Sequence, residues 1–438
     1  MDWWMTLLLG MAVLLTLLFV GMPIFVAFLI LNVAGVFWLI GPSGFGMFAN
    51  SIYTTASTGS LAAVPLFILM GEVLFRSGAM EVLLTSLDRL VGNIRGRQYV
   101  LCILLSAICG ALAGAAMAVA GLLGRSLYPT MQQRGYDERL SAGTILGGAS
   151  LDPIIPPSVL AIIIASLAKV STGKLLMAGL VPGLVLMVMF LIYVLVRVKL
   201  KPSLAPDLSE DLRNPDTKGS ALVAFLKMLP VSLIFLTVVG FIMMGVATPT
   251  EAAATGVIGS LILAAAYGGL NLEMLRLSLF SGVRVAGIML AIMACATMFS
   301  QLLIFSGALG QLGDFVLHLD LSFYLMLLVL LGLPFLLFMF LDQVSVLMVL
   351  VPLYQPIIQH YEYDPIWFWA LVLIVATVGG ITPPFGYTLY AFKSAVPTVE
   401  TKLLFSAAWP FVWIIVAGMA LMAVFPELIT FVPNMMRG

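Results

Sequence analysis

Long apolar stretches separated by short polar segments run through this chain of 438 residues. A helix of about 17–25 mostly apolar residues is long enough to cross the hydrocarbon core of a membrane. The pattern predicts spans near residues 4–20, 24–41, 58–75, 138–168, 174–198, 225–246, 252–269, 285–305, 366–396 and 403–424. Two further apolar stretches, 98–132 and 322–358, are predicted to be re-entrant hairpins. An ordinary span is the alternative for the first, because Arg97 and Arg125 bracket about the right length.

The composition agrees with this pattern. Hydrophobic residues make up 62% of the chain and charged residues 9%, with a mean hydropathy of +1.16, whereas soluble proteins have about 25% charged residues. We therefore expect an all-α polytopic membrane protein. The net charge of zero gives no basis for binding nucleic acid. The N-terminus has no basic segment or small-residue cleavage site before its apolar run, which predicts a first span and not a removable signal.

Residues that perform catalysis or bind transition metals are scarce. The chain has three cysteines, all in apolar runs, and two histidines. They form no metal-ligand spacing, and they suggest neither a disulfide framework nor a Ser-His-Asp arrangement. The sequence therefore predicts a protein that is not an enzyme.

An internal duplication is visible at an offset of 227 positions. Pro156-Pro157 and Pro383-Pro384 each interrupt a long apolar segment, and they are separated by this offset. At the same offset Tyr136-Asp137 matches Tyr363-Asp364. We expect two repeats, residues 1–199 and 222–438, joined by a polar linker over 200–221.

Each proline pair is predicted to break a membrane helix, one over 138–168 and one over 366–396. Proline removes a backbone donor and clashes with the preceding turn. In a membrane, broken backbone is tolerated only where it is buried in protein or lines a cavity. Unwound backbone offers carbonyl oxygens to a small cation, and the half-helix that follows offers N–H groups to a carboxylate. Paired interruptions therefore point to a transporter's binding site; simple packing kinks are the alternative.

The basic residues predict the orientation in the membrane. They cluster in the loops around 89–97, 134–139 and 197–218, which we expect to be cytoplasmic, with the N-terminus and residues 42–57 outside. Each half then has five spans and a hairpin, and an odd number of spans inverts the second half. Mixed charged and apolar residues predict interfacial amphipathic helices at 78–93 and 271–283.

Four acidic residues lie in or beside apolar runs: Asp152, Asp342, Glu72 and Glu251. Acids inside a membrane are costly and are functional candidates by default. This argument favours a functional role for Asp342, while for Asp152 a buried structural acid is an equal alternative. Glu72 and Glu251 lie near span ends, where structural roles such as helix capping are expected.

Several motifs together resemble the large membrane subunit of tripartite ATP-independent periplasmic (TRAP) transporters over nearly the whole chain. They are Arg-Gly-Tyr-Asp at 134–137, Ile-Ile-Pro-Pro-Ser at 154–158, Ala-Thr-Pro-Thr-Glu-Ala-Ala-Ala at 247–254, Phe-Leu-Asp at 340–342 and Ile-Thr-Pro-Pro-Phe-Gly at 381–386.

The resemblance implies secondary uptake of an organic acid across the bacterial inner membrane, driven by sodium ions. It implies two partners, a soluble periplasmic substrate-binding protein and a small membrane subunit, and an elevator-type movement. The expected substrate-binding residues are Pro157, Ser158, Thr382, Pro384 and Gly386. The expected sodium-binding residues are Ala113, Ala115, Ser150, Asp152, Asp342, Gln343, Ser345, Gly379 and Thr382.

The chain departs from the family pattern at the tip of the first hairpin. Residues 110–116 read Gly-Ala-Leu-Ala-Gly-Ala-Ala, where the family usually has a Ser-Gly-Ser-like element. Asp152 stands where the family usually has glycine, and Val375 where it usually has asparagine. Either the Asp152 carboxylate replaces the missing hydroxyl ligands, or the first cation site is weaker.

Two other functions stay open. One is a self-sufficient dicarboxylate or anion carrier of the same superfamily, which would need no binding protein. The other is a membrane enzyme or receptor, but an enzyme would need converging His, Asp or Glu residues, and the sequence shows no such motif.

Overall fold

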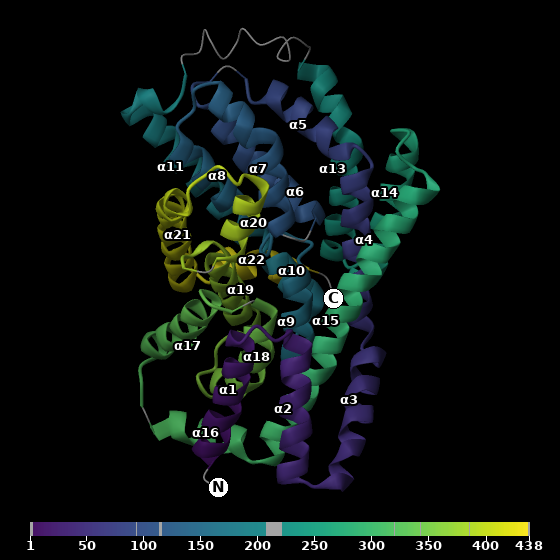
Figure 1. Ribbon diagram of the computed structural model, residues 1–438, viewed down its shortest axis with the longest axis vertical. Helices are drawn as coiled ribbons and strands as arrows, with labels where there is room; N and C mark the ends of the chain where they lie inside the picture. Colours follow the sequence, from purple (N-terminus) through teal and green to yellow (C-terminus); the bar gives the residue numbers. More distant parts are fainter. Residues whose placement is uncertain are drawn as a thin grey trace.

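The computed structural model describes residues 3–92, 94–113, 116–206, 221–318, 320–341, 343–384 and 386–436. These residues form α-helices and short 3-10 helices, with no strand among them, which confirms the all-α prediction (Figure 1). In the first half the α-helices are α1 (Trp3–Phe19), α2 (Ile24–Leu39), α3 (Gly46–Ser57), α4 (Ala63–Arg76), α5 (Ala79–Leu90), α6 (Arg97–Ala113), α7 (Ala116–Gln133), α8 (Glu138–Ala149), α9 (Val159–Ala168), α10 (Thr172–Ala178) and α11 (Leu180–Leu200). In the second half they are α13 (Ala221–Met243), α14 (Pro249–Ala266), α15 (Leu272–Phe305), α16 (Ala308–His318), α17 (Phe323–Phe338), α18 (Gln343–His360), α19 (Pro365–Ile381), α20 (Tyr387–Ala395), α21 (Thr401–Val424) and α22 (Glu427–Met435).

Among the described residues, six helical segments are apolar and long enough to cross a membrane. Shorter apolar helices, including α1, α2, α17 and α19, accompany them. The helices carry exposed apolar side chains such as Leu233 and Ile262, which are 60% and 65% exposed. Exposed apolar residues on long helices are what a multi-pass membrane protein presents to lipid.

Both predicted broken helices are broken where the proline pairs lie. The first is α8 followed by α9, and the second is α19 followed by α20. The predicted hairpins are the helix pairs α6–α7 and α17–α18, and the arms of each pair pack against each other. The second arm of each hairpin also packs on the half-helix of the other half, α7 on α20 and α18 on α9.

The helix boundaries recur at the offset of the duplication. Adding 227 to the bounds of α7 gives 343–360, which are the bounds of α18. Figure 1 places α5 near the top of the molecule and its counterpart α16 near the bottom. This placement supports an inverted second half, which stays a prediction, as do the repeat boundaries at 199 and 222; residues 207–220 of the linker lie outside the described part.

The duplicated Tyr-Asp pairs have a local structural role. The carboxylate of Asp137 accepts a hydrogen bond from the Leu140 backbone N–H at 2.8 Å and so caps α8. Asp364 caps α19 in the same way, through Trp367 at 2.8 Å. An aspartate at this position satisfies one of the backbone donors that a helix start leaves free. The matched flanks therefore fix where both broken helices begin.

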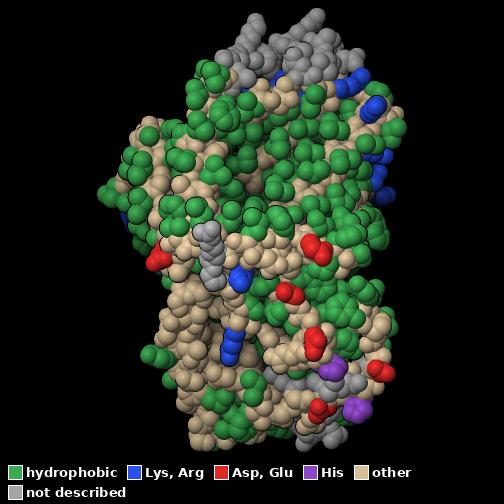
Figure 2. All heavy atoms as spheres, turned by 180° about the vertical axis from the view of Figure 1, so that it is seen from behind, with side chains coloured by type: hydrophobic (Ala, Val, Ile, Leu, Met, Phe, Trp, Pro, Cys, Tyr) green, Lys and Arg blue, Asp and Glu red, His purple; other side chains and the backbone are tan. Residues whose placement is uncertain are grey.

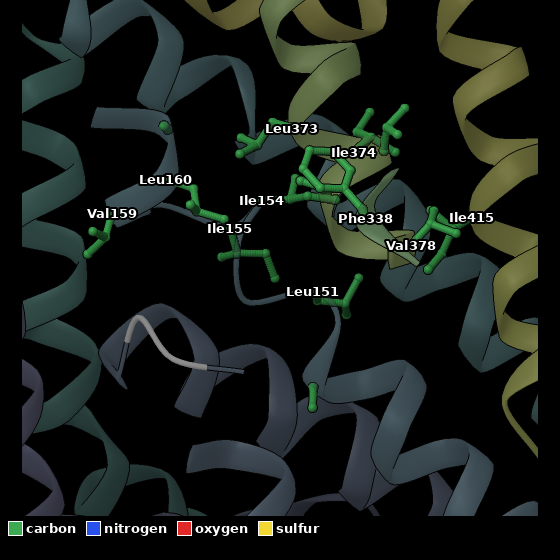
Figure 3. Packing of buried hydrophobic residues seen from close by; sticks show 14 of the residues in the cluster. Leu151, Ile154, Ile155, Val159, Leu160, Phe338, Leu373, Ile374, Val378 and Ile415 are labelled. Carbon is green, nitrogen blue, oxygen red and sulfur yellow. The ribbon is translucent and has the colours of Figure 1, made fainter. Parts of the chain in front are cut away.

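The broken helices lie at the centre of the molecule. Every residue of α8 from Leu140 to Ala149 and of α19 from Trp367 to Ile381 is buried. In Figure 3 the apolar side chains of the first interruption lie beside those of α19 and α17, with Ile154 near Phe338 and Ile374. Interrupted backbone is thus surrounded by protein, as the membrane environment requires.

One prediction at the helix level is wrong. Residues 271–283 are not a separate interfacial helix, because they continue into the predicted span 285–305 as the single helix α15, capped by Asn271. Residues 42–57 contain α3, and their predicted place outside the membrane stays a prediction. α3 and α4 together occupy the positions that α15 occupies in the second half. They are separate helices because Thr58, with an extended backbone (ψ 101°), ends α3.

Candidate functional site

The first interruption runs from Ser150 to Ser158, and both serine hydroxyls bond to nearby backbone. The Ser150 hydroxyl donates to the carbonyl oxygen of Gly147 at 2.7 Å. The Ser158 hydroxyl donates to the carbonyl oxygen of Pro153 at 2.5 Å and accepts from the Ala161 N–H at 3.2 Å, capping α9. These bonds hold the loop in shape, while the start of α9 offers further N–H groups to an anion.

The second interruption has a related arrangement. The Thr382 hydroxyl donates to the carbonyl oxygen of Val378 at 2.6 Å, and the Gly386 N–H donates to the carbonyl oxygen of Thr382 at 3.1 Å. Gln343, at the start of α18, donates its amide N–H to the carbonyl oxygen of Ala376. This bond ties the tip of the second hairpin to the end of α19. Both X-Pro bonds, Pro156-Pro157 and Pro383-Pro384, are cis.

A cavity of about 680 Å³ joins elements of both halves. Asp152, Pro153 and Ser158 of the first interruption line it, together with Gln343 of the second hairpin and Tyr387 at the start of α20. Residues of α4 and α15 and Met117 at the start of α7 also line it. The start of both half-helices, α9 and α20, therefore faces one space.

Three charged side chains line this cavity within the described part of the chain: Glu72, Arg76 and Asp152. Glu72 and Arg76 are one turn apart on α4, and their oxygen and nitrogen atoms lie 3.1 Å apart. The other carboxylate oxygen of Glu72 accepts a hydrogen bond from Ser281 of α15 at 2.6 Å. Arg76 is the sole basic side chain among these lining residues.

Asp152 lies directly against the first hairpin. A β-carbon at Gly110, on α6, would be 3.0 Å from the Asp152 α-carbon and 3.1 Å from its β-carbon. Asp152 is only 4% exposed. The structure therefore brings the backbone and β-carbon of Asp152 against the first predicted hairpin, at Gly110.

The predicted site residues divide into four groups. Asp152, Ser158 and Gln343 line the cavity. Gly386 lines a neighbouring cavity of about 450 Å³ that shares Met117 and Tyr387 with the first. Six further described residues do not line the large cavity: Ser150, Pro157, Ser345, Gly379, Thr382 and Pro384. Asp342, Ala115 and the side chain of Ala113 lie outside the described part of the chain.

Gly379 shows why some of these residues are needed without facing the cavity. A β-carbon there would be 2.1 Å from the β-carbon of Phe338, so the second hairpin approaches α19 more closely than any other residue would allow. Within the described residues no cluster of three or more His, Cys, Asp or Glu side chains could hold a metal ion. Asp152 is the described carboxylate nearest the first interruption, while the predicted ligand Asp342 lies outside the described residues.

Sequence reasoning did not identify Glu72, Arg76, Met117 and Tyr387 as lining residues. Glu72 was expected to have a structural role, and its bonds to Arg76 and Ser281 agree with that, but it also faces the cavity. The four-residue spacing of Glu72 and Arg76 indicates a pair on one helix face. No local signal places that face opposite the interruptions, because this depends on how α4 packs in the whole molecule.

The comparisons with known proteins agree with this architecture. The family model of the tripartite ATP-independent periplasmic transporter, DctM component, matches residues 11–428. The chain belongs to this family. It is 29% identical over 397 residues to the C4-dicarboxylate TRAP transporter large permease protein DctM of Pseudomonas aeruginosa, covering 90% of this chain and 91% of that one.

A second relative and a solved structure extend the comparison. The chain is 28% identical over 427 residues to the sialic acid TRAP transporter large permease protein SiaM of Vibrio cholerae, covering 97% of each chain. Its fold is similar to the crystal structure of the YdaH transporter of Alcanivorax borkumensis, with a TM-score of 0.64, 14% identity, and 89% and 91% of the two chains covered. The chain is thus a transporter subunit of the membrane and not an enzyme.

Proposed function

We propose that this permease subunit takes up an organic acid across the bacterial inner membrane, driven by a sodium gradient. The observation that supports this best is the cavity of about 680 Å³ that receives the starts of α9 and α20. Two helix N-termini directed at one space favour a carboxylate. The relatives named for C4-dicarboxylates and sialic acid also handle anions of this class.

The charges around the cavity support coupling to a cation. Glu72, Arg76 and Asp152 together give the described lining a net charge of −1 when all three are ionised. A monocarboxylate would raise the negative charge to −2 beside Asp152, which is only 4% exposed, and unpaired buried charge is costly. One or two sodium ions near Asp152 would offset it. The substrate and the cation are therefore expected to bind together.

The distribution of surface charge supports the proposed orientation. On the face shown in Figure 2, most of the basic side chains lie in the upper half, while acidic and histidine side chains lie mostly in the lower half. Basic loops favour the cytoplasmic side. The upper end is then cytoplasmic, and the lower end would meet the periplasmic binding protein. In the elevator arrangement that we propose, the hairpins and broken helices move against α4 and α15.

Transport by reconstituted protein tests this function. Proteoliposomes containing this chain and its small membrane subunit are given radiolabelled succinate or N-acetylneuraminate. Each substrate is supplied free or loaded on the periplasmic binding protein with which we propose the chain works. We expect accumulation only with an inward sodium gradient and a loaded binding protein.

The controls separate the alternatives. Equal uptake with potassium replacing sodium would show that the sodium assignment is wrong. Equal uptake of free substrate without a binding protein would instead support a self-sufficient carrier. If neither substrate accumulates but another ligand of the binding protein does, the proposed substrate class is wrong. The proposal of sodium-driven uptake through a binding protein then still stands.

A further inference from the structure

A second cavity, of about 190 Å³, lies where the start of α8 meets the last turns of α11 and the first half of α21. It shares no lining residue with the large cavity. In Figure 1, α11 and α21 lie on the same side of the molecule. The lining residues are Asp137, Arg139, Leu140, Tyr193, Arg197, Ala407, Pro410 and Phe411.

Two guanidinium groups meet in this cavity. Arg139 donates from Nε and Nη2 to the carbonyl oxygen of Ser406 at 3.2 and 2.8 Å, which fixes it beside α21. The side chain of Arg197 is exposed and makes no hydrogen bond or ion pair with the described residues. The hydroxyl of Tyr193 lies within electrostatic reach of both. Arg139 and Arg197 carry two positive charges, and the carboxylate of Asp137, which caps α8, carries one negative charge. The lining therefore has a net charge of +1.

Exposed apolar side chains flank the cavity on both helices. On α11, Ile192 and Val196 are 56% and 47% exposed. On α21, Trp409 and Trp413 are 38% and 63% exposed, with ring centroids 6.0 Å apart. Tryptophan is typical of the border between headgroups and hydrocarbon. The cavity therefore has a basic end and two apolar walls that continue along lipid-facing helix surfaces.

We propose that this cavity binds the phosphodiester of an anionic phospholipid, with its acyl chains along α11 and α21. One phosphodiester has a charge of −1, which balances the lining. Guanidinium groups bind phosphate oxygens through paired, charge-assisted hydrogen bonds, and basic pockets between membrane helices hold lipid headgroups. The lipid would join α8, the first part of a broken helix, to α11 and α21.

Lipid-dependent thermal stability of the purified full-length protein in detergent tests the proposal. Phosphatidylglycerol should raise the melting temperature of the wild type. Arg197→Gln should raise the half-saturating lipid concentration about tenfold or more, because a charge-assisted hydrogen bond is lost. Arg197→Gln should also fold, since the side chain it replaces is exposed. Lys199→Gln is the matched control, because it removes the same charge from the same helix outside the cavity.

The other probes distinguish the source of the phosphate. sn-Glycerol 3-phosphate and inorganic phosphate should not stabilise the protein at matched concentrations, and phosphatidylethanolamine should do so more weakly than phosphatidylglycerol. Equal responses of the wild type and Arg197→Gln would overturn the site. Equal stabilisation by glycerol phosphate or by phosphatidylethanolamine would overturn its assignment to an anionic lipid.

Discussion

The contact between Gly110 and Asp152 gives a prediction whose size can be estimated from the structure. Gly110→Ala places a β-carbon 3.0 Å from the Asp152 α-carbon, and 3.5 Å from its backbone nitrogen. Carbon atoms are in optimal contact at about 3.5–4.0 Å, so α6 and the first interruption must separate by roughly 0.5 Å or more. An extra methyl group in a well-packed site typically costs about 1–3 kcal/mol.

The effect on sodium follows if Asp152 is a ligand. The separation displaces the carboxylate from the geometry in which it binds the ion, whereas without sodium the loop can relax. If sodium binding bears the whole cost, the half-saturating sodium concentration for uptake rises about 5- to 150-fold. Sodium-dependent uptake in proteoliposomes measures this concentration. Gly121→Ala is the control, because a β-carbon at that position of the same hairpin meets nothing within 4 Å.

The outcomes separate packing from ligation. A lower melting temperature with wild-type sodium dependence would show that Asp152 supports the loop without binding the ion. Wild-type values for both would refute the close approach of α6 to the interruption. A shift in the control as large as that in Gly110→Ala would mean that any change in this hairpin has the same effect.

Three further predictions concern the cavity and its supports. Asp152→Gly should impair sodium coupling, and adding Ala113→Ser and Ala115→Ser should restore part of it non-additively; normal sodium-dependent uptake by the single variant would exclude a ligand role. Arg76→Gln should raise the half-saturating concentration of an anionic substrate at least about fivefold, since it removes the sole cation of the described lining. Arg76→Lys keeps the charge and should have a smaller effect. The same half-saturating concentration for both variants would show that the charge of Arg76 does not bind the substrate. Gly179→Ala should lower the yield of monodisperse protein by size-exclusion chromatography, because its β-carbon would be 2.0 Å from a backbone oxygen of the first interruption, whereas Gly240→Ala, with nothing within 4 Å, should not.

Much of the architecture could be predicted from local signals. Proline ends helices wherever it cannot be accommodated, so the two interruptions were predicted at the correct positions. The Thr-Pro-Thr-Glu sequence predicted a cap, and the structure has a capping box between Thr248 and Glu251. Each of these signals involves residues only a few positions apart in the chain.

The rest depends on packing between distant segments. The continuity of α15 was missed because charged residues in 271–283, Glu273 and Arg276, suggested an interfacial helix, while nothing between the two predicted segments breaks the backbone. The wall formed by Glu72 and Arg76 was missed because it faces the interruptions only after α4 packs against α15. The basic pocket of Arg139 and Arg197 also appears only when α8, α11 and α21 come together.

The central claim is that substrate and sodium bind in the cavity between the two interruptions and α4. Cysteine labelling at Met117, which lines the cavity and is 52% exposed, tests it most directly. The native cysteines are buried, so a water-soluble maleimide should react mainly with Met117→Cys. Leu272→Cys, at a position 83% exposed at the start of α15, is the control. The account predicts that sodium and the transported acid together slow labelling at position 117 and leave position 272 unchanged. An unchanged rate at 117, in a preparation that accumulates the same acid, would contradict it.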